Sequence, residues 1–129
     1  MKLDDIRSNL ADQDRGRWLD ILDPWEGQLV LRLRIAGPDS DVQHRARIQM
    51  MDELAAAADG EGKVSFELRE KARVNCLGRC VLGWEIEEDG KPLPFSHKAL
   101  LVFLNVAWIQ QQVDAFAGDR AHFRSPAAA

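Results

Sequence analysis

The sequence has no tyrosine, only two cysteines and no long apolar run. Cys76 and Cys80 lie four residues apart in a predicted helix, where a disulfide would constrain almost nothing, so we expect two reduced thiols buried in the core. No window approaches the roughly 18 apolar residues that a membrane-spanning helix needs, and the first residues lack the apolar core of a signal peptide. These absences exclude a disulfide-bonded scaffold and predict a cytoplasmic protein with no membrane partner.

Sequence motifs of common enzymes are also missing. The chain has no glycine-rich phosphate loop, no nucleophile elbow and no His-Glu-x-x-His motif. The three histidines, His44, His97 and His122, are isolated and lack the paired spacing of structural zinc ligands. The acidic run at residues 85–89 is typical of a solvated hairpin tip, since nothing nearby would orient its carboxylates. We therefore predict no catalytic residue, no metal and no cofactor.

The charge balance is mildly acidic, with 17 basic and 21 acidic side chains and a net charge of -4. General nucleic-acid binding is not favoured, because neutralising phosphates requires a basic surface. Two local groups of basic side chains nevertheless leave a nucleic-acid or acidic-partner patch open as an alternative. They are Arg32 and Arg34 on one strand face, and Arg69, Lys71, Arg73 and Arg79 in one helix.

The N-terminal part of the chain predicts a short helix followed by a β-hairpin. Within residues 1–16, only Leu3, Ile6 and Leu10 fall at helical spacing, so this segment is a candidate to fold onto a partner. Two strands then flank a turn at residues 23–27. Alternation in the second strand places four apolar side chains on one buried face: Leu29, Leu31, Leu33 and Ile35.

Two long helices are predicted after this hairpin. Ser40 is placed to cap the first helix, with Gln43 three residues later completing a capping box, and the helix runs to about residue 58. The glycines at positions 60 and 62 break the chain. The second helix is predicted over residues 65–82, with Phe66 among the residues that trace one face and a nearly all-apolar C-terminal end in the core.

A second hairpin is predicted within residues 84–96. Asp89 and Gly90 are typical of a tight turn with positive φ angles. Pro92 and Pro94 cannot donate ladder hydrogen bonds, so the return arm is an edge strand or an extended loop. This return arm leads to the start of the next helix.

The C-terminal third is predicted to be helical: Ser96 caps a first helix, and after Asn105 the chain resumes as a helix from Trp108 to Ala117. A further helix after Gly118 is not expected. The predicted fold class is α+β, with an N-terminal β-hairpin, two long helices, a second short hairpin or extended arm, and a helical C-terminal third. Residues 1–129 form a single domain, and residues 1–16 and 124–129 are candidates for mobile ends.

Aromatic side chains suggest where a partner could bind. Most of the four tryptophans and five phenylalanines are expected in the core. Trp25, however, lies in a turn, and exposed aromatic residues commonly anchor interactions. The apolar run at residues 100–104 is a second candidate surface. The candidate partner-binding residues are Trp25, Leu100, Leu101, Phe103, Leu104, Trp108 and Phe123.

The order of residues in the C-terminal third resembles the tail assembly chaperones of long-tailed bacteriophages. The resemblance covers residues 84–123 and includes the Trp84-Glu85 pair, the acidic-Gly turn and the Pro-Phe-Ser pattern. Gln112-Val113 and Phe116 fall in the same order, and Gly37-Pro38-Asp39-Ser40 is similar to the family's middle region. The structural signature consists of Trp84, Asp89, Gly90, Pro92, Pro94, Phe95, Ser96, Asp119 and Arg120.

The resemblance implies a protein without enzymatic activity. Such chaperones are thought to coat the long, hydrophobic tape measure protein, keep it soluble, and recruit tail tube subunits. They act in the bacterial host cytoplasm and leave before the virion matures. For this chain, the implied partners are the phage tape measure protein, the tail tube protein as a further candidate, and other copies of itself.

Two alternatives of other classes remain open. A structural virion protein of the tail or neck would stay in purified particles. A small nucleic-acid-binding regulator would use Arg69, Arg73 and Arg79, and its binding would weaken as salt concentration rises.

Overall fold

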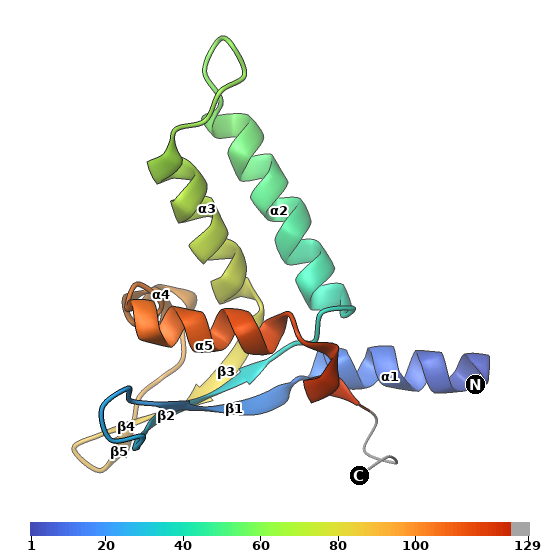
Figure 1. The fold of residues 1–129 in the computed structure, drawn as a ribbon, viewed down its shortest axis with the longest axis vertical. Helices are drawn as coiled ribbons and strands as arrows, with labels where there is room; N and C mark the ends of the chain where they lie inside the picture. Colours follow the sequence, from blue (N-terminus) through green and yellow to red (C-terminus); the bar gives the residue numbers. More distant parts are fainter. Residues whose placement is uncertain (125–129) are drawn as a thin grey trace.

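The computed structural model describes residues 1–124 and shows the predicted α+β class (Figure 1). Residues 125–129, which belong to the predicted mobile end at 124–129, lie outside the described residues. The elements in chain order are α1 (Leu3–Arg15), β1 (Arg17–Leu22), β2 (Leu29–Ile35), α2 (Asp41–Ala57), α3 (Phe66–Arg79), β3 (Val81–Glu85), β4 (Glu87–Glu88), β5 (Lys91–Pro92), α4 (His97–Leu104), α5 (Ala107–Ala117) and the 3-10 helix η1 (Arg120–Phe123).

A three-stranded antiparallel sheet has β2 at its centre, between β1 and β3. The predicted N-terminal hairpin is confirmed as β1 and β2. Leu31, Leu33 and Ile35 are at most 2% exposed, as the alternation predicts. The same prediction is wrong for Leu29, which is 56% exposed. The reason is a register shift: Ile21 pairs with Leu31 but Leu22 pairs with Leu29, so the extra residue Val30 interrupts the alternation and turns Leu29 off the buried face.

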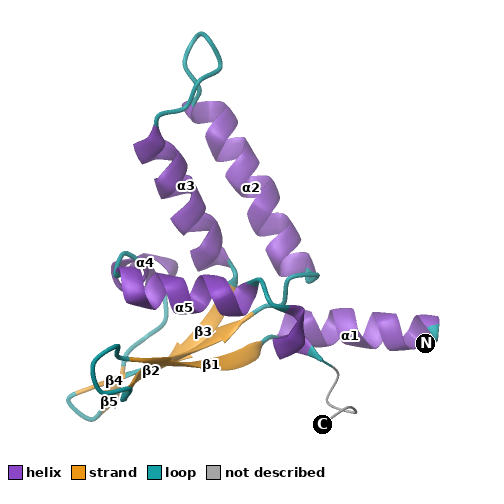
Figure 2. Ribbon diagram, in the orientation of Figure 1, coloured by secondary structure: helices purple, strands orange, loops and turns teal. Residues whose placement is uncertain are grey.

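The core lies between one face of this sheet and helices α4 and α5 (Figure 2). The inward-facing apolar side chains of the strands form one side of the core, and the apolar stripes of the two helices form the other. η1 closes one end, where Phe123 packs edge-to-face on Phe116 with ring centroids 5.3 Å apart. Fully buried side chains from both layers include Ile21, Leu33, Ile35, Leu100, Leu104 and Val113.

Helices α2 and α3 form an antiparallel pair that projects away from the sheet (Figure 1). The prediction for the second helix is wrong at its end, because α3 stops at Arg79 and residues 81–85 form β3. This apolar stretch fits a helix or a strand, and pairing of Val81 with Ile35 decides in favour of the strand. Phe66, the first residue of α3, is 87% exposed because it lies at the projecting end of the pair.

The start of α2 shows half of the predicted capping box. The Ser40 hydroxyl accepts a hydrogen bond from the Gln43 backbone N–H at 3.1 Å, which confirms the cap. The Gln43 side chain does not reach back to Ser40. Its amide instead donates to the carbonyls of Ala36 (2.8 Å) and Ala117 (2.9 Å). One buried amide therefore ties the end of β2 to the end of α5.

Helix α1 projects away from the rest of the chain, and no other element lies beside its first turns (Figure 1). Its base is held by three sets of contacts. Asp12 forms an ion pair with Arg17, the Asn9 amide donates to the Phe123 carbonyl at 2.9 Å, and Gln13 accepts from the Asp39 backbone N–H at 2.8 Å. The predicted helix in residues 1–16 is thus confirmed, with a fixed C-terminal end.

The second hairpin is confirmed as β4 and β5. Asp89 and Gly90 adopt φ angles of 53° and 76°, the positive values that the turn requires. Ser96 accepts from the Ala99 backbone N–H at 3.1 Å and caps α4 as predicted. The prediction that no helix follows Gly118 is wrong, because the short 3-10 helix η1 follows it. The Asp119 carboxylate caps η1 by accepting a hydrogen bond from the Ala121 backbone N–H.

Candidate partner-binding surfaces

Trp84 joins the sheet to the second hairpin arm and to α4. Its indole N–H donates to the Leu93 carbonyl at 2.8 Å. Its ring packs edge-to-face on Phe95 and Phe103, with centroids 5.3 and 5.6 Å away. Trp84 therefore has a structural role, since its indole N–H and its ring both contact other parts of the chain.

Trp25 is presented on the surface by a rigid turn. The Asp23 carboxylate accepts hydrogen bonds from the backbone N–H groups of Trp25, Glu26 and Gln28 at 2.9, 2.7 and 2.8 Å. These donors, that of Glu26 first, hold the pKa of Asp23 below its usual value. Trp25 is 79% exposed and meets Trp108 edge-to-face at 5.9 Å. The predicted candidates Trp25 and Trp108 are thus brought together.

The buried members of the candidate set cannot contact a partner while the fold is intact. Leu100 and Leu104 are 0% exposed and Phe123 is 1% exposed. Their prediction as contact residues is wrong, because the apolar run faces the sheet on one side of α4 and η1 folds back onto α5. Leu101, Phe103 and Trp108 are half-buried at the edge of the core. Val102, in the same run, is 69% exposed.

The remaining signature residues also have structural positions. Pro92 lies in β5 opposite Glu87, and Pro94 is exposed just before the α4 cap. The Arg120 guanidinium binds both carboxylate oxygens of Asp39 at 2.8 Å, which lowers the pKa of Asp39. The C-terminal turn is thereby fastened to the start of α2.

Sequence reasoning missed the role of Gln112. Its side-chain amide donates to the Leu22 carbonyl at 2.8 Å and accepts from the Leu22 backbone N–H at 3.1 Å. This amide takes the place of a neighbouring strand at the end of β1. No spacing rule identifies such a contact, because the two residues are 90 positions apart.

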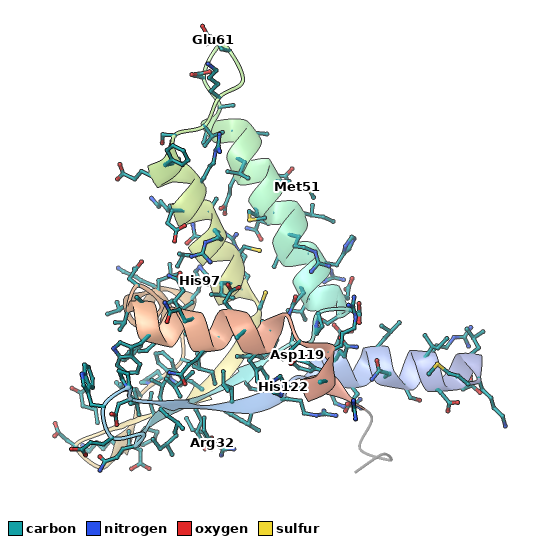
Figure 3. All side chains as sticks on the ribbon, viewed as in Figure 1. Arg32, Met51, Glu61, His97, Asp119 and His122 are labelled. Atoms are coloured by element: carbon teal, nitrogen blue, oxygen red, sulfur yellow. The ribbon has the colours of Figure 1, made fainter. Side chains whose placement is uncertain are left out.

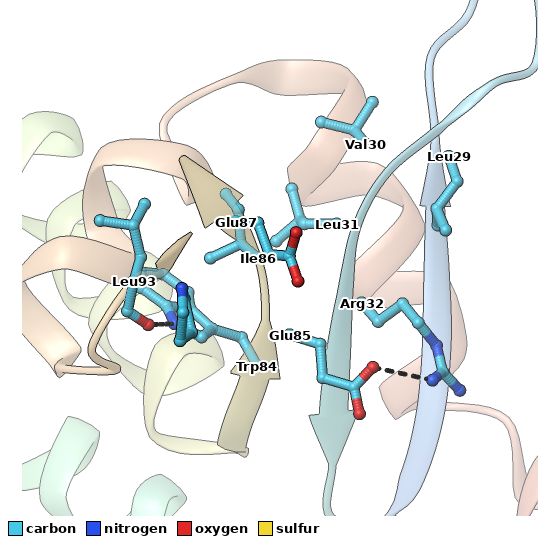
Figure 4. A pocket seen from close by; sticks show the side chains of 10 residues that line it. Leu29, Val30, Leu31, Arg32, Trp84, Glu85, Ile86, Glu87 and Leu93 are labelled. Atoms are coloured by element: carbon cyan, nitrogen blue, oxygen red, sulfur yellow. Dashed lines mark hydrogen bonds and ion pairs between the residues drawn. The ribbon is translucent and has the colours of Figure 1, made fainter. Parts of the chain in front are cut away.

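A groove of about 410 Å³ lies between the start of β2 and the β4–β5 hairpin (Figure 4). Its lining includes Val30, Trp84, Ile86 and Leu93. At its rim, the Arg32 guanidinium binds the carboxylates of Asp20 at 2.8 Å and Glu85 at 3.0 Å. The same guanidinium lies over the Trp18 ring, 5.1 Å from its centroid. The groove thus combines an apolar wall with an ion-pair network.

The first turns of α1 carry an apolar stripe in solvent. Leu3, Ile6 and Leu10 are 61%, 44% and 38% exposed, and they fall at helical spacing on one side. These are the residues that the sequence placed at helical spacing. Figure 3 shows α1 extending away from the body with side chains around it and no element beside its free end.

The basic side chains of α3 do not form an open basic face. Arg73 pairs with Glu70 at 2.7 Å, and Arg79 pairs with Glu53. Arg69 lies over the Phe66 ring at 5.5 Å. Ion pairs thus compensate two of the four positive charges of α3 that a nucleic-acid interface would use.

The histidine and cysteine side chains do not come together in one site. Within residues 1–124, no group of three or more His, Cys, Asp or Glu side chains could hold a metal ion. His97 is partly buried, and burial lowers its pKa. Cys80 is buried and Cys76 half-buried, both as free thiols. The neighbouring Cys80 thiol lowers the pKa of Cys76 to about 7, and the charges of Arg79 and Arg47 act in the same direction.

Comparison with known proteins does not identify a family. No protein-family model matches the sequence, and no curated protein and no solved structure matches it. None of the helices within the described residues combines the length and the apolarity needed to cross a membrane.

Proposed function

We propose that this chain is a phage tail assembly chaperone that binds and solubilises the tape measure protein. The observation that carries the proposal is the exposed apolar stripe of Leu3, Ile6 and Leu10 on α1, a helix whose base is fastened to the body. An amphipathic helix with an unpaired apolar side packs naturally against another apolar helix. Such packing would shield the hydrophobic surface of a long tape measure protein from water.

The projecting α2–α3 pair supports the same role with a second apolar surface. Ile48, Met51 and Phe66 are 42%, 57% and 87% exposed along it. Elements that extend from the body can reach a long partner, a tail tube subunit or another copy of the chain without rearrangement of the core. The net charge of -4 would keep the resulting complex soluble.

Coexpression with the tape measure protein tests this function. The soluble fraction of the tape measure protein should rise when the wild-type chain is present, and the two proteins should copurify. Ile6→Asp together with Leu10→Asp should abolish copurification, because two charges would be placed in the apolar contact. Ser8→Asp is the matched control, since Ser8 is exposed and lies on the other side of α1.

Two results would count against the proposal. One is a tape measure protein that stays insoluble with every full-length and fragment form tested. The other is equal solubilisation by the stripe variant and the control. Mass spectrometry of mature virions separates the structural alternative, because a chaperone should be absent from the particles and a tail or neck component should remain.

A further inference from the structure

A cavity of about 200 Å³ lies where α2, α3 and α5 meet. Three sulfur-containing side chains line it: Met50 from α2, and Cys76 and Cys80 from the end of α3. Cys80 is 5% exposed, whereas Met50 and Cys76 are half-buried. The sulfur cluster is therefore shielded from most of the solvent, while two of its members remain accessible.

The spacing of the two cysteines suits a bridging ion better than a disulfide. Cys80 follows α3 with helical backbone angles (φ -78°, ψ -14°), and its thiol donates to the Cys76 carbonyl at 3.3 Å, so both side chains lie on one face. Residues four apart on a helix have Cβ atoms about 5–6 Å apart, whereas a disulfide needs about 3.8 Å. Two metal–thiolate bonds of about 2.3 Å instead place the sulfur atoms up to about 4.6 Å apart. One ion can therefore bridge the thiols without unwinding the helix.

The ligand chemistry of the cluster selects a soft metal ion. Thiolate and thioether sulfur favour Cu(I), whereas Mg²⁺ and Ca²⁺ take oxygen ligands. A structural zinc site needs four ligands, and within residues 1–124 no group of three or more His, Cys, Asp or Glu side chains could supply them. Two oxygen-bearing side chains also line the cavity, but both face arginines. The Gln43 side-chain oxygen accepts from Arg47 at 3.4 Å, and the Asp114 carboxylate lies 3.9 Å from Arg73.

The charge around the cluster favours a monovalent ion. Two thiolates and one monovalent cation together carry a single negative charge. The positive charges of Arg47 and Arg79 both act on the Cys76 sulfur. Arg79 is paired with Glu53, but Arg47 forms no ion pair within residues 1–124, so its charge remains available to such a complex. A divalent ion would leave no net negative charge for these arginines to stabilise.

We propose that Cys76, Cys80 and Met50 form a binding site for one soft monovalent metal ion of the Cu(I) class. The two thiolates hold the ion, and the Met50 thioether completes a three-sulfur site. Each thiol that binds releases its proton to the solvent, and the metal keeps its oxidation state. Because Met50 belongs to α2 and the cysteines to the end of α3, a bound ion ties the two projecting helices together. The site does not rest on the proposed chaperone function.

The test uses the whole, reduced chain in oxygen-free buffer. Cu(I) is titrated in competition with a coloured Cu(I) chelator, and Ag(I) serves as a second probe that does not change its oxidation state. One ion should bind per chain with a thiolate-to-metal absorption band in the ultraviolet, and Zn(II) in about tenfold excess should not displace it. Cu(I) should also raise the melting temperature, because the folded chain binds it more tightly than the unfolded chain does.

Four variants locate the ion. Cys76→Ser and Cys80→Ala should each weaken Cu(I) binding at least about hundredfold, since loss of a ligand costs more than loss of a group that orients one. Met50→Leu keeps the side-chain volume and should weaken binding about tenfold. Met51→Leu is the matched control, because Met51 is 57% exposed, and it should leave binding unchanged. Melting of the metal-free variants shows which are folded, and Cys76→Ser, at a half-buried position, decides the test if Cys80→Ala unfolds.

Four results would overturn the proposal. They are equal affinity of the wild type and Cys76→Ser, binding by Met50→Leu as tight as by Met51→Leu, displacement of Cu(I) by Zn(II), and one ion shared between two chains in analytical ultracentrifugation. Failure of the tape measure protein to copurify would leave this site intact, because the site contains no residue of the α1 stripe.

Discussion

Replacement of Trp84 by alanine should destabilise the fold by about 3 kcal/mol. The indole hydrogen bond to Leu93 contributes about 1 kcal/mol. The edge-to-face contacts with Phe95 and Phe103 contribute about 0.5–1.5 kcal/mol each. Loss of the buried part of the ring adds to these values, but Trp84 is only half-buried, so the cost stays at the low end of the range of about 3–5 kcal/mol for a core tryptophan.

Urea unfolding followed by circular dichroism at the helix signal measures this change without relying on tryptophan fluorescence. Trp84→Phe keeps one aromatic ring but removes the hydrogen bond and part of the packing surface, so at least about 1 kcal/mol should be lost. A double-mutant cycle with Phe95→Ala should show positive coupling. A cost below about 1 kcal/mol for Trp84→Ala would refute the structural role. Reduced partner solubilisation at unchanged stability would make Trp84 a contact residue instead.

Three further predictions concern individual side-chain contacts. Gln43→Leu should lower the free energy of unfolding by about 2–4 kcal/mol, because the carbonyls of Ala36 and Ala117 lose their donor, whereas Gln49→Leu on the exposed side of α2 should cost less than about 0.5 kcal/mol in the same urea titration. The Arg17 guanidinium lowers the folded-state pKa of Asp12, so the stabilisation is complete above the unfolded-state pKa and is lost as pH falls through the lower folded-state pKa. The stability advantage of the wild type over Asp12→Asn should therefore disappear on acidification below about pH 4, and an advantage that grows in acid would contradict this sign. In Cys80→Ala, removal of the thiol that lowers the pKa of Cys76 should shift the pH midpoint of its alkylation by iodoacetamide upward from about 7, and an unchanged midpoint would contradict that cause.

Local signals predicted the elements that depend on local chemistry. The Asp89-Gly90 turn and the caps at Ser40 and Ser96 were readable, because each depends on one side chain and its immediate backbone. The alternation in β2 likewise gave its buried face. These features together were enough for the α+β class.

Features that depend on long-range pairing were not readable from the sequence. The stretch after Arg79 is apolar on all sides, and only its pairing with β2 makes it a strand. The same limit applies to the contact residues: the apolar character of Leu100, Leu104 and Phe123 suggests a binding surface, but the sheet that buries them is assembled from segments far away in the sequence. The α1 stripe was visible as a pattern, and its exposure follows only from the absence of a neighbouring element in the described chain.

Amide hydrogen exchange of the copurified complex tests the central claim most directly. Exchange in α1 should slow on binding of the tape measure protein, with the largest change in the turns that carry Ile6 and Leu10, because the apolar stripe becomes covered by the partner. The free chain should show rapid exchange in the same turns. A complex in which α1 exchanges as fast as in the free chain would contradict the account.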